Sequence, residues 1–177
     1  ANFFALNYKT LVQIGKWIFV HAGLTMNCCR NTNICKINNA VSRFLLDIEP
    51  EKNKLIYKKC VNSENSDNSP VWNRDFGETI TDERENRQLS GKYSLLIDEY
   101  NKYNSDYHQK YNIPSAEYLG IGHTPQFFEE KGINSTCNGK VWRCDVGMSK
   151  AFGSEKDSNR KPQVLEILND DIINVLS

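Results

Sequence analysis

The clearest pattern in the chain is a short, mainly apolar stretch that ends at a histidine, and it occurs twice. The run Trp17–Val20 leads directly into His21, and the stretch Glu117–Ile121 leads through a glycine into His123. Short apolar runs bounded by turn residues predict strands buried on both faces of a sheet. Because the chemistry of α/β sheets collects beyond the carboxyl ends of the strands, both histidines stand where a binding site is expected.

A single histidine at such a position can equally be a core residue that is hydrogen-bonded to the backbone, as most buried polar groups are. The repetition changes the comparison, because the chain has three histidines and two of them end strands. Neutral imidazole is the commonest side-chain metal ligand, so we expect His21 and His123 to converge on one metal ion. The third, His108, lies in a helical pattern beside polar residues and is predicted to be a surface histidine.

The remaining periodicity predicts a strand-rich chain with helices inserted between the strands. Strands are expected where apolar residues alternate, and helices where they recur every three to four positions. Asn138-Gly139 is a strong hairpin signal. The further predicted strands are 9–14, 133–137, 140–144, 163–168 and 172–176, and the predicted helices are 35–48, ended by Pro50, and 89–111. Segments 25–35 and 62–69 are predicted to be polar loops, and 81–87 is predicted to be charged and solvated. This order indicates a layered α/β sheet.

Length and charge narrow the functional classes. The chain has 177 residues and a formal net charge of +0, so no global electrostatic attraction favours nucleic acid or an anionic membrane. Its longest apolar runs are far shorter than a membrane span, and the first residues lack the pattern of a signal peptide. We therefore expect a cytoplasmic protein with no nucleic-acid partner and no membrane span.

The chain contains six cysteines. Without a secretion signal, all six are predicted to be reduced thiols. Cys28-Cys29 with Cys35 could supply half of a zinc knuckle, but no second ligand pair stands at the usual spacing, so free thiols are the favoured interpretation.

Four stretches carry the candidate chemistry, and their order matters more than any one of them. They are 19–24 (Phe-Val-His-Ala-Gly-Leu), 70–74 (Pro-Val-Trp-Asn-Arg), 122–126 (Gly-His-Thr-Pro-Gln) and 143–153, which begins Arg-Cys-Asp-Val-Gly-Met-Ser. In this order and spacing the chain resembles the calcineurin-like metallophosphoesterases, and within them the Shewanella-like, bacterial-type branch of the phosphoprotein phosphatases. The resemblance spans about residues 10–168.

The resemblance implies roles for particular residues. It makes His21 and His123 ligands of the second metal of a two-metal site, and Arg74 the group that grips the substrate phosphate. Residues Asn73, Thr124, Asp145, Met148 and Ser149 are expected to border the pocket. A planar guanidinium matches two phosphate oxygens, which suits the role given to Arg74; the alternative is a surface arginine stacked on Trp72. Ala22 stands where the family usually has glycine, which is harmless if its φ is negative.

The resemblance also implies a fold and a missing part. Relatives carry three motifs before the first histidine, namely Gly-Asp-x-His-Gly, Gly-Asp-x-x-Asp-Arg-Gly and Gly-Asn-His-Glu, and none is present here. Residues 1–177 are therefore expected to be the C-terminal portion of a calcineurin-like phosphoesterase domain, half of a four-layer α/β/β/α sandwich. The N-terminal half would be supplied by the same chain or in trans.

Three functions remain open from the sequence. The favoured one is a metal-dependent phosphatase acting on Ser/Thr, or alternatively Tyr, phosphoproteins with two divalent ions (Mn, Fe or Zn), which clamp nucleophile and phosphate in such sites. The second is a phosphoesterase for diadenosine polyphosphates or other small molecules. The third is a non-catalytic structural or binding module derived from this fold. With only half of the metal ligands, the chain by itself is expected to be inactive.

Overall fold

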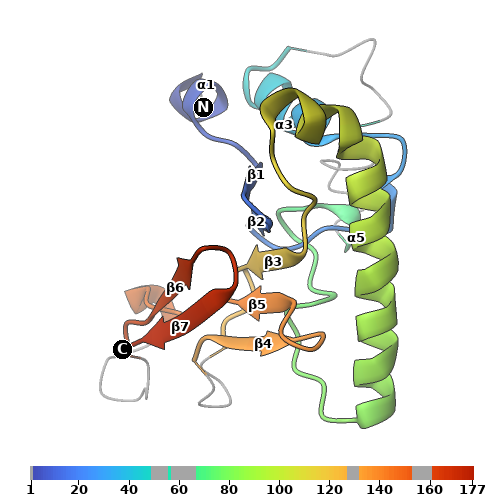
Figure 1. Ribbon diagram of the computed structural model, residues 1–177. Coiled ribbons are helices and arrows are strands. Elements are labelled where there is room, and N and C mark those ends of the chain that lie inside the picture. The colour runs from blue at the N-terminus through green and yellow to red at the C-terminus, as the bar shows by residue number, and fades with distance from the viewer. Residues whose placement is uncertain (1, 49–55, 57–66, 127–131, 153–160) are drawn as a thin grey trace.

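The structure, a computed structural model, describes residues 2–48, 56, 67–126, 132–152 and 161–177. The described part is mixed α/β, with two β-sheets and one long helix (Figure 1). The predictions for Pro50 and for most of segment 62–69 fall outside the described residues.

A five-stranded sheet forms the centre, with strand order β1-β2-β3-β5-β4. Strands β1 (Leu11–Ile14) and β2 (Trp17–Val20) pair antiparallel across the Gly15-Lys16 turn, where Gly15 has a φ of +55°. Strand β3 (Tyr118–Ile121) then runs parallel to β2, and β5 (Val141–Arg143) runs parallel to β3. The edge strand β4 (Asn134–Thr136) returns antiparallel to β5, as the Asn138-Gly139 signal predicted.

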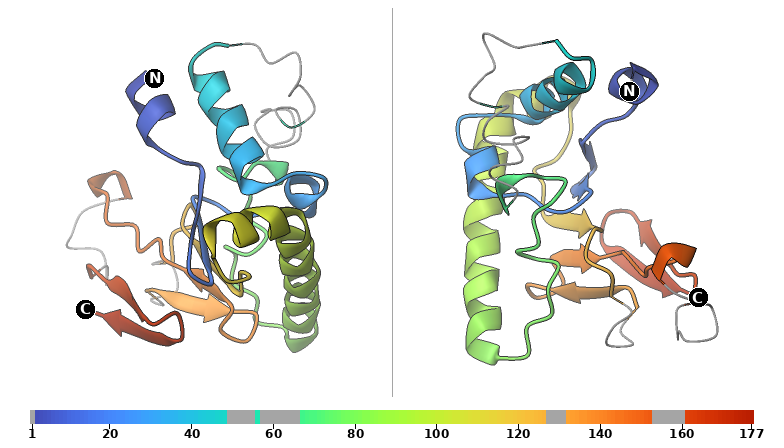
Figure 2. Two further views of the ribbon diagram at one scale, coloured as in Figure 1. Left: turned by 45° about the horizontal axis from the view of Figure 1, so that its top comes forward. Right: turned by 180° about the vertical axis from the view of Figure 1, so that it is seen from behind.

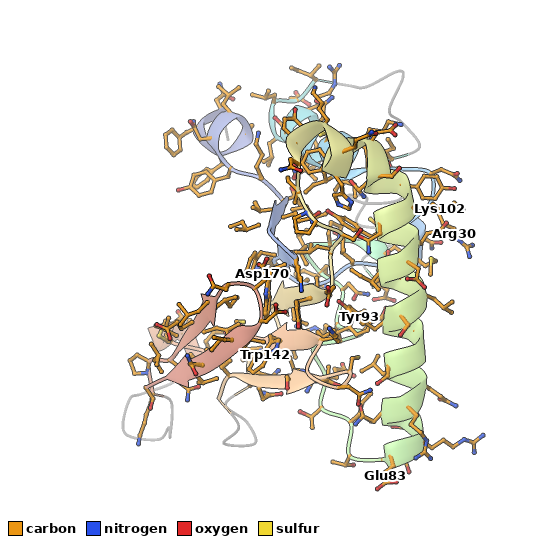
Figure 3. All side chains as sticks on the ribbon, in the orientation of Figure 1. Arg30, Glu83, Tyr93, Lys102, Trp142 and Asp170 are labelled. Carbon is orange, nitrogen blue, oxygen red and sulfur yellow. The ribbon has the colours of Figure 1, made fainter. Side chains whose placement is uncertain are left out.

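Helix α5 (Glu83–Tyr111) covers one face of this sheet (Figure 1). Its buried residues, among them Tyr93, pack on strand residues of that face, and Figure 3 shows Tyr93 between the helix and the sheet. The helix begins six residues before the predicted start, because the Asp82 side chain accepts hydrogen bonds from the amides of Arg84 and Glu85. The segment 81–87, predicted to be charged and solvated, therefore consists largely of the exposed first turns of the helix.

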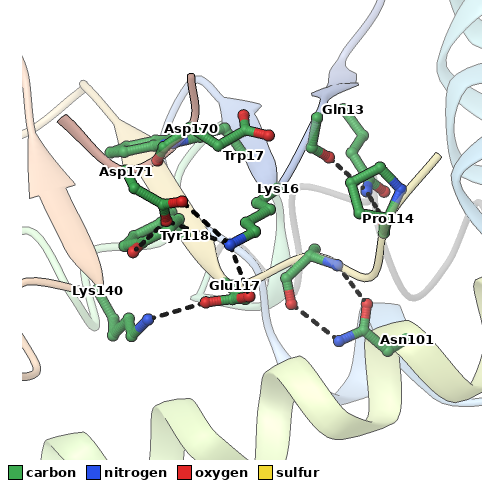
Figure 4. A network of polar contacts seen from close by, with 12 residues as sticks. Gln13, Lys16, Trp17, Asn101, Pro114, Glu117, Tyr118, Lys140, Asp170 and Asp171 are labelled. Atoms are coloured by element: carbon green, nitrogen blue, oxygen red, sulfur yellow. Dashed lines mark hydrogen bonds and ion pairs between the residues drawn. The ribbon is translucent and has the colours of Figure 1, made fainter. Parts of the chain in front are cut away.

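The opposite face carries a second sheet, the hairpin of β6 (Val164–Leu168) and β7 (Ile172–Leu176), so helix and hairpin lie on opposite sides (Figure 2). The tight turn of the hairpin docks on the start of β2. The indole Nε1 of Trp17 donates to the carbonyl of Asp170 at 2.9 Å, and Lys16 Nζ lies 3.2 Å from Asp171 (Figure 4). Trp17 also stacks on Tyr118, with ring centroids 4.7 Å apart.

Helices α1 (Asn2–Asn7) and α3 (Ile34–Leu45) lie near the β1 edge, and the short helix α2 (Met26–Cys29) packs against α5. Helix α2 is a correction, because segment 25–35 was predicted to be a loop; Thr25 caps it by accepting from the Cys28 amide. Helix α3 places Asn38 against the outer edge of β1. There the Asn38 amide accepts from the Leu11 N–H at 2.9 Å and donates to the Leu11 carbonyl at 2.8 Å.

Two predictions about single residues are wrong. His108 is buried rather than on the surface, because its ring turns toward the sheet and bonds Gln13. Cys28 is disulfide-bonded rather than reduced, while Cys29, Cys35, Cys137 and Cys144 are free. No helix within the described ranges is long and apolar enough to cross a membrane.

Candidate metal and phosphate site

The candidate site lies beyond the carboxyl ends of three strands of the central sheet, which end side by side. Because β2, β3 and β5 are mutually parallel, the residues that follow them emerge side by side. The residues in question are His21 after β2, His123 after β3 and Asp145 after β5. Backbone hydrogen bonds extend this alignment past the strand ends, since the Gly122 amide donates to the His21 carbonyl at 2.8 Å.

The two histidines that the sequence singled out face one another. Nε2 of His21 lies 3.2 Å from Nδ1 of His123, and the ring centroids are 5.0 Å apart. Two nitrogens that each lie roughly 2.0–2.1 Å from a tetrahedral zinc ion are themselves separated by about 3.3 Å. The observed separation is that of a hydrogen bond between the two rings, and it is also close to that of two imidazoles that share one ion. The described residues contain no group of three or more His, Cys, Asp or Glu side chains arranged to hold a metal, so the pair is an incomplete ligand set.

The backbone at His123 is unusual. Its φ is +65°, in the left-handed region that non-glycine residues seldom adopt, although histidine is enriched there. Conformations of this kind cluster at functional sites, where the surrounding structure holds them. The neighbouring Gly122 allows the close approach of the two strand ends, because a Cβ there would lie 3.3 Å from the His21 carbonyl oxygen. Strand-end geometry thus turns the His123 ring toward His21.

The surroundings of His123 favour its neutral form. Burial is the main cause that lowers its pKa from the ordinary value, and the positive charge of Arg74 and the proximity of His21 act in the same direction. Asp145 opposes them but does not outweigh them. At neutral pH the ring therefore keeps a lone pair, which is the form that ligates metals.

The segment 70–74 lies next to the site and is not part of the sheet. It is attached beside His21, where the amides of Ala22 and Gly23 both donate to the Pro70 carbonyl. The Trp72 ring lies against the His123 ring with centroids 5.0 Å apart, although the tryptophan is mostly exposed. The departure at Ala22 is harmless, since this residue is not among the described non-glycine residues with positive φ.

An open cleft of about 650 Å³ runs along the strand ends. Three of the predicted site residues line it: His21, His123 and Asp145. Other lining residues are Val71, Gly122 and Cys144, together with side chains from β1, β2 and β3. Asp145 itself accepts a hydrogen bond from the Gly147 amide at 2.9 Å, which holds the turn after β5.

The remaining predicted residues are not among those that line this cleft. Asn73 is buried and organises its own loop, since its side chain accepts from the Asp75 amide at 3.1 Å. Thr124 packs against Gly77, where an added Cβ would clash with it. Met148 and Ser149 are exposed beyond the Asp145 turn, and Arg74 is exposed beside Trp72.

Comparison with known proteins finds similarity along the whole chain. The sequence is 27% identical over 177 residues to Shewanella-like protein phosphatase 2 of Arabidopsis thaliana, covering 100% of this chain and 37% of that protein. The resemblance to the Shewanella-like phosphatases is confirmed. No family model matches the sequence.

The fold is similar to that of a solved phosphatase structure. A cold-active protein tyrosine phosphatase superposes with a TM-score of 0.51 at 18% identity, over 96% of this chain and 42% of that one. A cold-active protein-tyrosine phosphatase of a psychrophilic Shewanella species gives a TM-score of 0.47 at 17% identity, over 96% of this chain and 43% of that one. The chain thus spans less than half the length of the relatives it matches.

The structure adds residues that the sequence did not place in the site. Trp72 contacts His123. The sequence feature that could have indicated this contact is the presence of an aromatic residue inside a candidate motif. Arg143 and Gln126 bond the segment that follows Arg74. The sequence feature that could have indicated Arg143 is weaker. This arginine stands at an inward position of the alternating strand Val141-Trp142-Arg143, where an apolar residue is usual.

Proposed function

We propose that the complete protein is a metal-dependent phosphatase that hydrolyses phosphomonoesters of phosphoproteins, with Ser/Thr or Tyr as the phosphorylated residue. The observation that carries this proposal is the separation of 3.2 Å between His21 Nε2 and His123 Nδ1 at adjacent strand ends. The names of the relatives, a Shewanella-like protein phosphatase and a protein tyrosine phosphatase, support the class of reaction.

In this proposal each residue has a separate task. His21 and His123 hold one ion through neutral ring nitrogens, and the lowered pKa of His123 keeps its nitrogen available near pH 7. Arg74 binds the phosphate of the substrate through the planar fork of its guanidinium. Two divalent ions (Mn, Fe or Zn) would supply charge neutralisation and a water of lowered pKa. Asn73, Thr124, Asp145, Met148 and Ser149 form the border of the pocket.

The proposal includes a partner for the exposed side of the sheet, namely the N-terminal half of the same domain, in the same chain or in trans. Two observations support it. First, Val12 and Ile14 of β1 are exposed on the face that carries Trp17, and so are apolar residues of the β6–β7 hairpin. Second, the chain covers 37% of its Arabidopsis relative. With α5, the central sheet and the hairpin already three layers, a fourth would complete an α/β/β/α sandwich.

Two alternatives concern the substrate and the activity itself. A phosphoesterase for diadenosine polyphosphates or other small molecules would use the same residues, and a non-catalytic module would use none of them. The conformation of His123 favours an active site over a module, because left-handed conformations of non-glycine residues cluster at functional sites. A cytoplasmic location stays a prediction, and the disulfide at Cys28 opposes it.

The histidine pair can be tested in the full-length protein. His21→Ala and His123→Ala should lower the bound metal and the hydrolysis of p-nitrophenyl phosphate and of phosphopeptides, while the fold is retained. His108→Gln is the matched control, because this histidine lies away from the site and bonds Gln13. Full metal content and full activity in both site variants would refute the proposal.

The 177-residue chain by itself provides a second test. Since it contributes two imidazoles and no third ligand among its described residues, we expect weak metal binding and no turnover. Addition of the N-terminal half should restore both. Robust metal-dependent hydrolysis by the isolated chain would contradict this expectation.

A further inference from the structure

Three consecutive carbonyl groups in the segment after Arg74 are held by two buried side chains. Arg143, at the end of β5, donates from Nε to the Phe76 carbonyl at 2.7 Å and from Nη2 to the Glu78 carbonyl at 2.7 Å. The carbonyl between them, that of Gly77, accepts from Nε2 of Gln126 at 2.9 Å. Both side chains are almost completely buried.

The two side chains are themselves joined through Asn134 of β4. Its Oδ1 accepts from Nη1 of Arg143 at 3.0 Å, and its Nδ2 donates to Oε1 of Gln126 at 2.9 Å. The Gln126 backbone amide also donates to the Asp145 carbonyl at 2.8 Å. The network therefore connects the ends of β3 and β5 to the loop, and the same two strand ends carry His123 and Asp145.

Holding the carbonyls of residues 76–78 also fixes the backbone position of Arg74. The amides of Gly77 and Glu78 both donate to the Arg74 carbonyl, at 2.9 Å and 3.3 Å, so fixing these two residues fixes the backbone of Arg74. Gly77 is also pressed against Thr124, because an added Cβ would lie 2.2 Å from the Thr124 hydroxyl. The loop is thus held against the residue that follows His123.

We propose that Arg143 and Gln126 are positioning residues that hold Arg74 at a fixed place relative to the His21–His123 pair. This proposal rests on the proposed function, in which Arg74 binds the substrate phosphate. Arg143 suits the task because a planar guanidinium offers several donors in fixed directions, and three of them are used here on oxygens of two different elements. A lysine ammonium has no such fork and would lose part of the set.

The test uses the full-length metal-loaded protein and four variants: Arg74→Ala, Arg143→Lys, Gln126→Met, and Arg74→Ala combined with Arg143→Lys. The probe is inorganic phosphate as a competitive inhibitor of p-nitrophenyl phosphate hydrolysis. Arg143→Lys should raise the inhibition constant of phosphate about tenfold, the size expected for loss of a buried hydrogen-bonded contact to a charged group. It should raise KM more than it lowers kcat, with metal content unchanged.

The double variant separates positioning from general destabilisation. If Arg143 acts through Arg74, adding Arg143→Lys to Arg74→Ala should not weaken phosphate binding further, whereas an independent effect would add. Gln126→Met removes the donor to Gly77 at similar volume and should repeat the result, and it decides the matter if Arg143→Lys does not fold. Trp142→Phe is the control, because its indole donates to the Gly139 carbonyl in the turn before β5.

The outcomes are distinguishable. Unchanged phosphate inhibition in Arg74→Ala would refute the assignment of Arg74 in the proposed function. A large effect of Arg74→Ala together with wild-type phosphate inhibition in Arg143→Lys and Gln126→Met would overturn only the positioning proposal. Additive effects in the double variant would overturn it as well.

Discussion

Nε2 of His108 lies 2.9 Å from Oε1 of Gln13, and the same oxygen accepts a hydrogen bond from the Tyr100 hydroxyl at 3.0 Å. The Gln13 amide nitrogen donates to the carbonyls of Gly15 and Pro114, so its oxygen must be the acceptor. Nε2 of His108 therefore carries a proton in this contact. The cluster joins β1 to α5 through buried polar groups, and burial lowers the pKa of His108.

This contact predicts a pH dependence of stability. Because the folded-state pKa of His108 is depressed, the unfolded chain takes up a proton first as the pH falls below about 6.5. Stability present above that pH is then lost toward lower pH. Between pH 7 and pH 5 the unfolding free energy of His108→Gln should fall less steeply than that of the wild type, measured by urea denaturation. Parallel curves for the two proteins would contradict the prediction.

The second prediction concerns Arg74. In the full-length protein, Arg74→Ala should lower kcat/KM for p-nitrophenyl phosphate by about 2–4 kcal/mol of transition-state stabilisation. The reason is the loss of a charged, forked donor beside His123. Arg87→Ala is the matched control, because Arg87 is an exposed arginine of α5 that pairs with Glu83 one turn away. Wild-type kcat/KM in Arg74→Ala would show that the phosphate is bound elsewhere.

The third prediction concerns the cysteines. In denatured protein alkylated without reductant, Cys28 should remain unlabelled while Cys29, Cys35, Cys137 and Cys144 are labelled, as read by peptide mass spectrometry. In the native protein Cys35 should react first, because it is exposed and burial raises the pKa of Cys29 to about 12 and that of Cys144 to about 11. Labelling of Cys28 before reduction would exclude the disulfide.

Much of the sheet could be predicted because its strands are marked locally. The strand Trp17–Val20 has the predicted bounds, and the hairpins around Gly15 and Asn138-Gly139 follow from turn chemistry. The convergence of His21 and His123 followed from one further assumption, that the two apolar strands are neighbours. Parallel pairing of strands about a hundred residues apart has no local signal, so that assumption needed the structure or a relative.

Two of the residues that sequence reasoning misplaced are polar residues whose partners are distant in the chain. His108 was assigned to the surface because its neighbours are polar, yet its partner Gln13 lies on β1. Arg143 was seen only as part of a motif, yet its acceptors lie in segment 76–78. The disulfide at Cys28 was missed because the redox state was inferred from the pattern of the first residues and not from the thiols themselves. Polar contacts of this kind depend on the tertiary structure, so a local sequence pattern does not reveal them.

The side-chain amide of Asn38 affects how the molecule can associate with other chains. By donating to and accepting from the backbone of Leu11, it occupies the position that a sixth strand would take beside β1. Exposed strand edges are templates on which other chains polymerise, and natural sheets obstruct them in various ways. Here a single side chain from α3 blocks the edge of the sheet. A strand of another chain therefore cannot extend the sheet by pairing with β1.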